Sequence, residues 1–216
     1  MKTGILFDLD GTLLDTLEDL ADATNATLEH FGYPTRSLAE IRRFVGNGAR
    51  RQITLSLPGG QTEEEIDRVL AWYKEYYAAH SQIKTRPYEG VLEALKQVKT
   101  LCPVAIVSNK PDVAVKILCG EFFPEVYSLG ERSGCPRKPA PDMVFDAMKA
   151  VGAENCIYVG DSEVDVLTAR NAGVPCLSVL WGFRDMDCLV EAGADHFCHT
   201  TAELVNSLKE MMNDGK

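Results

Sequence analysis

The stretch that decides the fold is Gly4-Ile-Leu-Phe-Asp-Leu-Asp-Gly-Thr12, close to the start of the chain. It opens with a short continuous apolar run, which is typical of a strand in a parallel sheet covered on both faces. Two carboxylates spaced two residues apart follow the run, and Gly11 then permits a sharp turn. Three further apolar runs of the same kind begin at Pro103, Ile157 and Pro175. These four runs predict the central strands of one sheet.

Helical patterns of apolar residues alternate with these runs, over residues 89–100, 142–151 and 165–172. A repeated order of strand and helix predicts an α/β fold with a doubly wound parallel sheet, a Rossmann-like core. A weaker run at His196–Cys198 predicts a further strand at an edge of the sheet.

Residues 15–84 interrupt this alternation because they carry only helical signals. We therefore predict an all-helical insert over 15–84 in an α/β core made of residues 1–14 and 85–216, with 11–15 and 81–87 as its two hinges. Each of three residue pairs in the insert resembles a capping box that opens a helix. These pairs are Thr16 with Asp19, Ser37 with Glu40, and Thr62 with Glu65.

Composition and charge exclude several classes of function. The 216 residues carry a net charge of −10, from 22 basic and 32 acidic side chains, which argues against a nucleic-acid partner. The seven cysteines include no C-x-x-C pair, so neither a disulfide framework nor a zinc knuckle is indicated. No run approaches the roughly 18 apolar residues of a membrane helix. We expect a soluble, cytoplasmic protein with no nucleic-acid or membrane partner.

Polar side chains follow three of the predicted strands, at the edge where ligands bind in doubly wound sheets. Asp8 and Asp10 end the first strand, Ser108 and Asn109 end the second, and Asp161 ends the third. Carboxylates that share a cleft repel one another unless a divalent cation or a proton lies between them. The acids therefore predict a Mg²⁺ site, and the alternative for the first pair is two turn-forming acids.

A lysine and a second acidic segment complete the set of candidate residues. Lys138 precedes Pro139 in a loop with a second proline at 141, which predicts a stiff, extended backbone that holds a cation near an anionic substrate. The alternative is a solvated surface lysine. Ser162 and Asp165 resemble another capping box, so Asp165 either caps and supports the site or ligates the metal directly.

Together these segments resemble the four motifs of the haloacid dehalogenase-like hydrolase superfamily. The resemblance covers essentially the whole chain, and the helical insert is similar to the small helical cap of that superfamily. Within it the chain most resembles the phosphoglycolate phosphatase group, through the opening at residues 8–16 and the Val-Gly-Asn-Gly loop at 45–48. The four motifs are Asp8-x-Asp10-Gly11-Thr12, Ser108-Asn109, Lys138-Pro139 and Gly160-Asp161-Ser162-x-x-Asp165.

The resemblance implies a two-step phosphate transfer. Asp8 would attack phosphorus and form an aspartyl phosphate. Asp10 would protonate the leaving oxygen and then deprotonate the water that hydrolyses the intermediate. Asp8, Asp161 and the backbone carbonyl of Asp10 would hold Mg²⁺. Because Asp10 is present, a phosphatase is favoured over a family member that displaces halide, which needs no acid there.

The resemblance also implies roles around the phosphate. Ser108 and Lys138, with backbone amides near Gly11 and Asn109, would bind the phosphoryl oxygens. Asp165, beside Ser162, would orient metal-bound water or Lys138. The cap residues expected to reach the leaving group are Asn47, Gly48, and Arg50 or Arg51.

The implied activity is hydrolysis of a small phosphorylated metabolite with Mg²⁺ as cofactor. Two alternatives stay open at this point. A phosphosugar mutase would use the same aspartyl phosphate, and a phospho-acceptor signalling module would use a similar cluster of acid, hydroxyl and lysine. The receiver-type modules of the second class are shorter and lack a helical insert after the first strand.

Overall fold

Strand β1 (Thr3–Phe7) lies inside a six-stranded sheet in the computed structural model, which describes residues 2–214. The other strands of this sheet are β4 (Val104–Pro111), β5 (Tyr127–Glu131), β6 (Asn155–Gly160), β7 (Cys176–Val179) and β8 (His196–Cys198). Their order is β5-β4-β1-β6-β7-β8, and all five pairings are parallel. The prediction of a doubly wound parallel sheet is confirmed, and β8 lies at an edge as expected.

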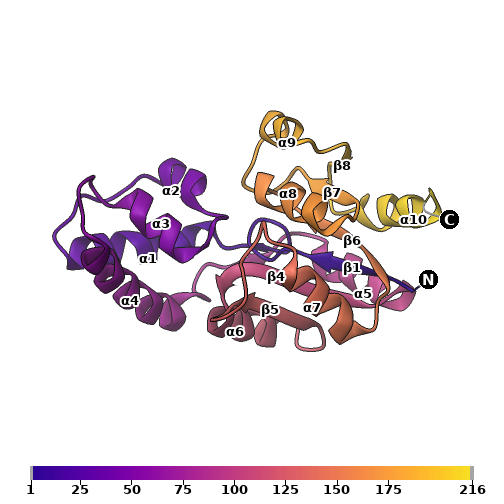
Figure 1. Ribbon diagram of the computed structural model, residues 1–216, viewed down its shortest axis with the longest axis horizontal. Helices are drawn as coiled ribbons and strands as arrows, with labels where there is room; N and C mark the ends of the chain where they lie inside the picture. Colours follow the sequence, from indigo (N-terminus) through magenta and orange to yellow (C-terminus); the bar gives the residue numbers. More distant parts are fainter. Residues whose placement is uncertain (1, 215–216) are drawn as a thin grey trace.

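Helices cover both faces of this sheet, as Figure 1 shows. One face packs against α5 (Val91–Leu101), α6 (Asp112–Phe122) and α10 (Leu204–Asp214), and the other against α7 (Asp142–Val151), α8 (Glu163–Ala172) and α9 (Met186–Ala192). Alternate side chains of β1 serve the two layers, because Ile5 and Phe7 belong to the first apolar core and Leu6 to the second. All three are fully buried, which explains why this strand has a continuous apolar run.

Strand β5 was not predicted from the sequence. It reads Tyr-Ser-Leu-Gly-Glu, and it pairs only with β4 because it forms the other edge of the sheet. An edge strand is covered less completely than a central one, so its sequence needs no continuous apolar run. Tyr127 is accordingly exposed and Leu129 is buried.

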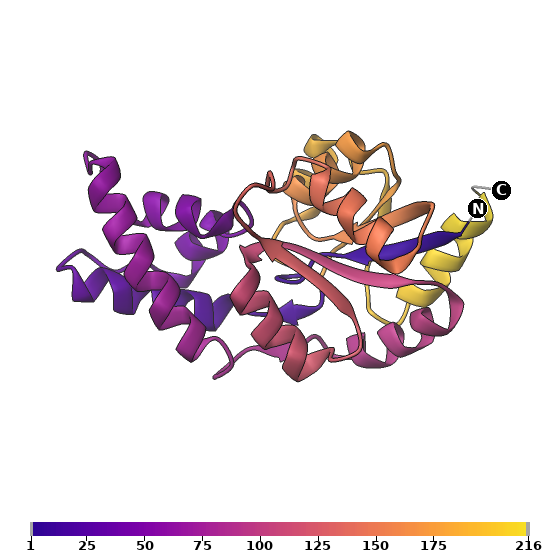
Figure 2. The same ribbon diagram turned by 60° about the horizontal axis from the view of Figure 1, so that its bottom comes forward.

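Four helices lie between β1 and α5 in the chain and form a separate layer beside the sheet (Figure 2). We call them the α1–α4 group, and they share an apolar core of their own that includes Leu28, Ile41, Ile53 and Val69. A two-stranded antiparallel sheet of β2 (Leu14–Asp15) and β3 (Arg86–Pro87) joins the two ends of this segment. The helices are α1 (Leu17–His30), α2 (Leu38–Phe44), α3 (Gly48–Ser56) and α4 (Glu63–His80).

Two of the three predicted capping boxes are confirmed, those of Ser37 with Glu40 and of Thr62 with Glu65. The third is wrong, because Thr16 precedes α1 without a side-chain cap. The Thr16 hydroxyl instead donates to Oδ1 of Asp10 at 2.6 Å.

Asp19, the other member of that pair, ties the two connecting segments together. Its buried carboxylate accepts the backbone N–H of Lys84 at 2.9 and 3.0 Å and that of Thr85 at 2.8 Å. Tertiary contacts from the segment before β3 have therefore replaced a local capping bond.

We expect Asp19→Asn to lower the free energy of unfolding by roughly 2 kcal/mol, because an amide group would turn a donor toward backbone donors in a buried place. Urea unfolding measures the change. Asp22→Asn is the matched control on the same helix, since Asp22 forms an exposed ion pair with Lys84 and its loss should cost less than about 1 kcal/mol. Equal effects of the two substitutions would contradict this role of Asp19.

Within residues 2–214, no helix combines the length and the apolar character that crossing a membrane requires.

Candidate active site

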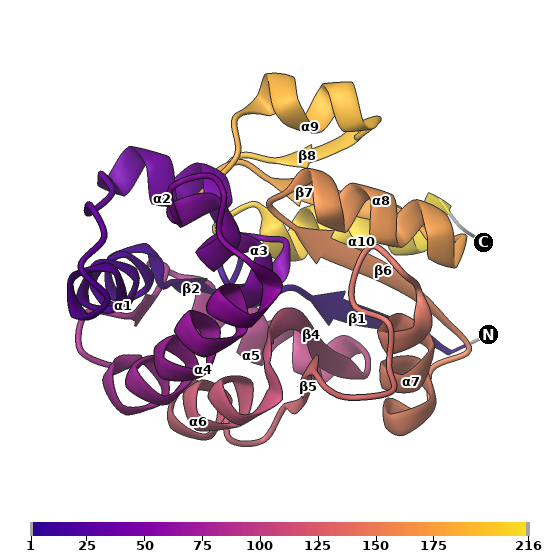
Figure 3. The same ribbon diagram turned by 60° about the vertical axis from the view of Figure 1, so that its left-hand side comes forward.

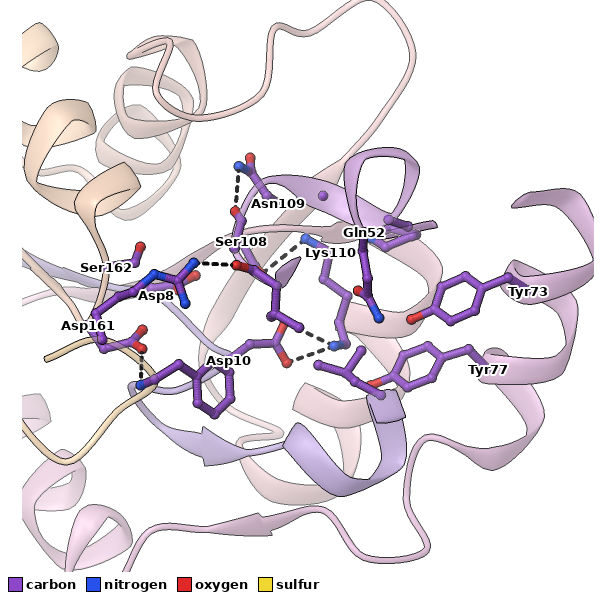
Figure 4. A pocket seen from close by; sticks show the side chains of 18 residues that line it. Asp8, Asp10, Gln52, Tyr73, Tyr77, Ser108, Asn109, Lys110, Asp161 and Ser162 are labelled. Atoms are coloured by element: carbon purple, nitrogen blue, oxygen red, sulfur yellow. Dashed lines mark hydrogen bonds and ion pairs between the residues drawn. The ribbon is translucent and has the colours of Figure 1, made fainter. Parts of the chain in front are cut away.

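The carboxyl ends of β1, β4 and β6 meet beside the α1–α4 group, and a cavity of about 40 Å³ lies between them. Figure 4 shows Asp8, Ser108 and Asp161 on the sheet side of this cavity and Tyr73 and Tyr77 on the opposite side. The residues from the α1–α4 group that line it are Leu20, Val45, Gly46, Gly48, Ala49, Gln52, Tyr73 and Tyr77.

Three buried carboxylates gather at the sheet side of the cavity. Asp8, Asp161 and Asp165 each place an oxygen within 4.8 Å of the other two. They come from the ends of two adjacent strands and from the first turn of α8, so parallel β1–β6 pairing is what brings them together. The predicted convergence of Asp8 and Asp161 is therefore present in the structure.

Lys138 is buried against this cluster, with its side chain 2% exposed. Its ammonium donates to Oδ1 of Asp8 at 2.8 Å, to Oδ1 of Asp165 at 2.7 Å and to the hydroxyl of Tyr158 at 3.0 Å. All three donors of the ammonium group are thus used. The alternative of a solvated lysine is wrong, because the loop after β5 turns Lys138 inward.

Both oxygens of Asp165 are already engaged. Oδ1 accepts from Lys138, and Oδ2 accepts from the backbone N–H of Ser162 at 3.1 Å and from its hydroxyl at 2.6 Å. Asp165 therefore caps α8 and orients Lys138 at the same time. This arrangement favours the supporting role over direct metal ligation.

The charges of the buried cluster do not balance. Three carboxylates against one ammonium leave a formal charge of −2 when all are ionised. Burial, only partly opposed by Lys138, raises the pKa of Asp8 from 3.8 to about 7. Burial together with the charges of Asp165 and Asp8 raises the pKa of Asp161 well above its usual value. Oxygen ligands with an excess of two negative charges fit a divalent cation such as Mg²⁺, which Asp8 and Asp161 would hold.

The metal-free protein should lose stability as the pH rises toward neutral. Between 3.8 and about 7 the folded protein holds the Asp8 proton more tightly than the unfolded chain does, so the free energy of unfolding falls with rising pH. We expect a loss on the order of 3 kcal/mol from this carboxyl.

Urea unfolding in EDTA across this pH range measures the loss. Asp8→Asn should have a shallower pH dependence than the wild type, Mg²⁺ should restore wild-type stability near neutral pH, and Asp146→Asn on the surface should behave like the wild type. The same slope in Asp8→Asn and the wild type would contradict the account.

Asp10 faces away from this cluster. Its carboxylate accepts from Nζ of Lys110 at 2.7 and 2.9 Å and from the hydroxyl of Thr16 at 2.6 Å. Its side-chain oxygens are not part of the carboxylate cluster formed by the described residues. The side chain of Asp10 is therefore not placed to ligate a metal at this cluster. Ligation by its backbone carbonyl stays a prediction.

Two glycines allow the backbone to pack against Asp161. Gly11 has φ +86°, and a Cβ there would lie 2.3 Å from Oδ2 of Asp161. A Cβ on Gly182 would lie 2.2 Å from Cβ of the same residue. The carboxylate also accepts from the hydroxyl of Thr12 at 3.2 Å and from the backbone N–H of Phe183 at 2.7 Å. Asp161 is therefore held rigidly, and the role of Gly11 in phosphate binding stays a prediction about its backbone.

Ser108 and Asn109 differ in what their side chains do. Ser108 lines the cavity, and its hydroxyl oxygen accepts the backbone N–H of Lys110 at 3.2 Å, so its own proton is available to an oxyanion. The Asn109 amide donates to the carbonyls of Gly46 and Lys138 and accepts the backbone N–H of Lys138. The Asn109 side chain thus fixes two loops around the site, and only its backbone is left for a phosphate.

The four residues expected to contact the leaving group divide into two sets. Gly48 lines the cavity, and Asn47 is the residue directly before α3. The prediction that Arg50 reaches the leaving group is wrong, because Arg50 forms ion pairs with Glu63 and Asp67 at the start of α4. Arg51 is exposed and lies outside the lining of the cavity.

Sequence reasoning missed Lys110, Tyr77 and Gln52, which all line the cavity. Lys110 could have been found, because it directly follows the Ser108-Asn109 motif. The other two lie on helices whose apolar stripes indicate packing only, so no local signal distinguished them.

Comparisons with known proteins place the chain in a family. The haloacid dehalogenase-like hydrolase model matches residues 5–179. The chain belongs to this family. Phosphoglycolate phosphatase 1 of Pseudomonas aeruginosa is 36% identical over 193 residues, which cover 83% of this chain and 70% of that one. Phosphoglycolate phosphatase of Rhodobacter capsulatus is 33% identical over 205 residues, which cover 91% and 93% of the two chains.

Solved structures of this haloacid dehalogenase-like hydrolase family agree with the fold. A Lactobacillus delbrueckii subsp. bulgaricus protein, described provisionally as a phosphoglycolate phosphatase, has a TM-score of 0.88 at 37% identity and covers 96% of this chain and 99% of its own. A predicted phosphoglycolate phosphatase from Haemophilus somnus 129pt has a TM-score of 0.84 at 26% identity, with 95% and 97% covered. The superfamily resemblance is confirmed, and the chain is a phosphoric monoester hydrolase.

Proposed function

We propose that this hydrolase is a Mg²⁺-dependent phosphatase that acts on 2-phosphoglycolate through an aspartyl phosphate on Asp8. The observation that carries the proposal is the buried cluster of Asp8, Asp161 and Asp165 around Lys138, with its excess of two negative charges. A buried cluster of this kind destabilises the fold unless a ligand neutralises it, which is typical of a functional site.

The first step forms a bond from a carboxylate oxygen of Asp8 to phosphorus and breaks the bond from phosphorus to the ester oxygen. Asp10 supplies the proton that the leaving oxygen takes up. When bound, Mg²⁺ adds positive charge beside the transferring phosphoryl group. Ser108 would donate its free hydroxyl proton to a phosphoryl oxygen. Lys138, whose donors are bound to Asp8, Asp165 and Tyr158, would act through its positive charge beside Asp8.

The second step hydrolyses the acyl phosphate. Asp10 takes a proton from a water molecule as that water attacks phosphorus, and Asp8 leaves as a carboxylate. The bonds from Lys110 and Thr16 hold the Asp10 carboxylate in place for both proton transfers. Asp10 starts the cycle as the neutral acid, gives its proton to the leaving oxygen and regains a proton from the attacking water, so atoms and charges balance.

The α1–α4 group acts in this proposal as a cap, with residues 15–84 forming it and residues 1–14 and 85–216 forming the core. Its position in Figure 3, in front of the carboxyl ends of the strands, supports this division. Contacts of α3 with β4 and of α4 with α6 hold the group against the core. A closed cap excludes bulk water from the aspartyl phosphate.

The substrate assignment rests on two observations. Several relatives of this chain are named phosphoglycolate phosphatases. The cavity that Asp10 lines is small, about 40 Å³, which favours a small leaving group.

Phosphate release tests the proposal. The panel contains 2-phosphoglycolate, a hexose 1-phosphate, a nucleotide and p-nitrophenyl phosphate, each with Mg²⁺ and with EDTA. We expect Mg²⁺-dependent release with the highest kcat/KM for 2-phosphoglycolate. Preference for another ester would contradict the substrate assignment, and full activity in EDTA would contradict the metal requirement.

A further inference from the structure

The ammonium group of Lys110 lies at the end of the cavity that the proposed leaving group occupies. The Lys110 side chain is only 3% exposed, and its Nζ lies 4.7 Å from the centre of the Tyr77 ring. Two of its three N–H donors are directed to the oxygens of Asp10. Beyond Asp10, the ammonium has no hydrogen-bond acceptor within residues 2–214, and it faces the Tyr77 ring.

Tyr77 provides a second donor without an acceptor. It is 2% exposed, and its hydroxyl has no hydrogen-bond partner in the described part of the chain. Tyr73, one turn earlier on α4, is equally buried and lines the same cavity. Figure 4 shows both tyrosines directed from α4 toward Lys110 and Asp10. A buried hydroxyl that lines a cavity and lacks a partner indicates a ligand that supplies one.

We propose that Lys110 and Tyr77 form a subsite that binds a carboxylate on the leaving group of the substrate. The inference rests on the proposed function, because that function places the leaving oxygen against Asp10. In 2-phosphoglycolate the carboxylate is joined to the ester oxygen by a single methylene. A leaving oxygen within hydrogen-bond distance of Asp10 therefore places this carboxylate within reach of the Lys110 ammonium, which lies 2.7 Å from Asp10 Oδ1.

The chemistry of the subsite distinguishes an anionic substituent from a neutral one. A carboxylate accepts a charge-assisted bond from the ammonium and a further bond from the tyrosine hydroxyl. A neutral alcohol in the same place lacks the charge. Because the ammonium is nearly removed from solvent, water screens little of this difference. The subsite therefore selects esters of small hydroxy acids over esters of small diols.

Two substrates of similar size test the subsite: 2-phosphoglycolate, and 2-hydroxyethyl phosphate, which carries an alcohol in place of the carboxylate. The readout is the ratio of their kcat/KM values, so a change in Asp10 that affects both substrates cancels. We expect Lys110→Met to lower the ratio by roughly 10- to 100-fold and Tyr77→Phe by roughly 3- to 10-fold. Tyr76→Phe is the matched control on the same helix and should leave the ratio at its wild-type value, because Tyr76 lies outside the lining of the cavity and stacks on Trp72 and His80.

The outcomes separate the inference from the proposed function. If Lys110→Met lowers kcat/KM equally for both substrates, Lys110 only positions Asp10 and the subsite is wrong. If Lys110→Met does not fold, the nearly isosteric Tyr77→Phe decides, and an unchanged ratio overturns the subsite. A wild-type enzyme that hydrolyses both esters equally well also overturns the subsite and leaves the phosphatase standing. If the wild-type enzyme hydrolyses no ester, both the subsite and the proposed function are overturned.

Discussion

Replacing Asp8 with Asn is expected to lower kcat by about 10⁴-fold or more, because an amide oxygen is a poor nucleophile toward phosphorus. The substitution keeps the size of the side chain and removes one negative charge from the buried cluster. The fold should therefore survive, and the metal-free protein should become more stable near neutral pH. Initial rates of phosphate release with 2-phosphoglycolate measure the effect.

Asp146→Asn is the matched control for this loss of activity. Asp146 lies on α7, away from the cavity, and forms a surface ion pair with Arg132. Its replacement should therefore leave kcat unchanged. Retention of more than about a hundredth of the wild-type rate in Asp8→Asn would exclude Asp8 as the nucleophile.

Replacing Lys138 with Met is expected to cause the largest loss of stability, roughly 3 to 5 kcal/mol in the absence of metal. The side chain has a similar length, but the buried carboxylates of Asp8 and Asp165 lose their shared cation and the Tyr158 hydroxyl loses a donor. Urea unfolding in EDTA at neutral pH measures the loss.

Lys149→Met on the exposed face of α7 is the control for Lys138→Met, with an expected change of less than about 0.5 kcal/mol. Adding Asp165→Asn to Lys138→Met should recover part of the loss, because one uncompensated charge is then removed. A Lys138→Met protein as stable as Lys149→Met would show that Lys138 does not hold the cluster together.

Residues directly at strand ends could be predicted from the sequence. Asp8, Ser108 and Asp161 each follow a continuous apolar run, and parallel strands bring their carboxyl ends to one edge of the sheet. The convergence of these three residues could therefore be predicted from the local sequence pattern. Strand β5 lacked such a run because it is an edge strand, and the pattern could not reveal it.

Residues that depend on tertiary contacts could not be predicted. Tyr77 and Lys110 meet because α4 packs against α6 and places a helical side chain over the end of β4. Nothing in the spacing around Tyr77 separates this contact from ordinary packing. Arg50 shows the opposite error. The sequence made it a candidate for contact with the leaving group, but its side chain forms ion pairs with Glu63 and Asp67 of the next helix.

The prediction for Thr16 and Asp19 failed for a related reason. The spacing of these two residues matches a capping box, but each side chain finds a partner distant in sequence or outside the helix. Thr16 bonds to Asp10 and Asp19 bonds to the backbone of the returning segment. The Thr16 contact connects the α1–α4 group to the candidate site, and the Asp19 contact connects the two ends of the segment that carries the group. A local motif describes neither contact.

Direct trapping of the aspartyl phosphate tests the central claim most directly. The Asp10→Asn variant with p-nitrophenyl phosphate is the right system, because this leaving group needs no proton while hydrolysis of the intermediate still needs the base. Acid quenching, borohydride reduction and peptide mass spectrometry then locate the phosphorylated carboxyl as homoserine. We predict homoserine at position 8, and its absence in the Asp8→Asn, Asp10→Asn double variant. Phosphate on any other residue, or turnover with no reducible acyl phosphate, would contradict the account.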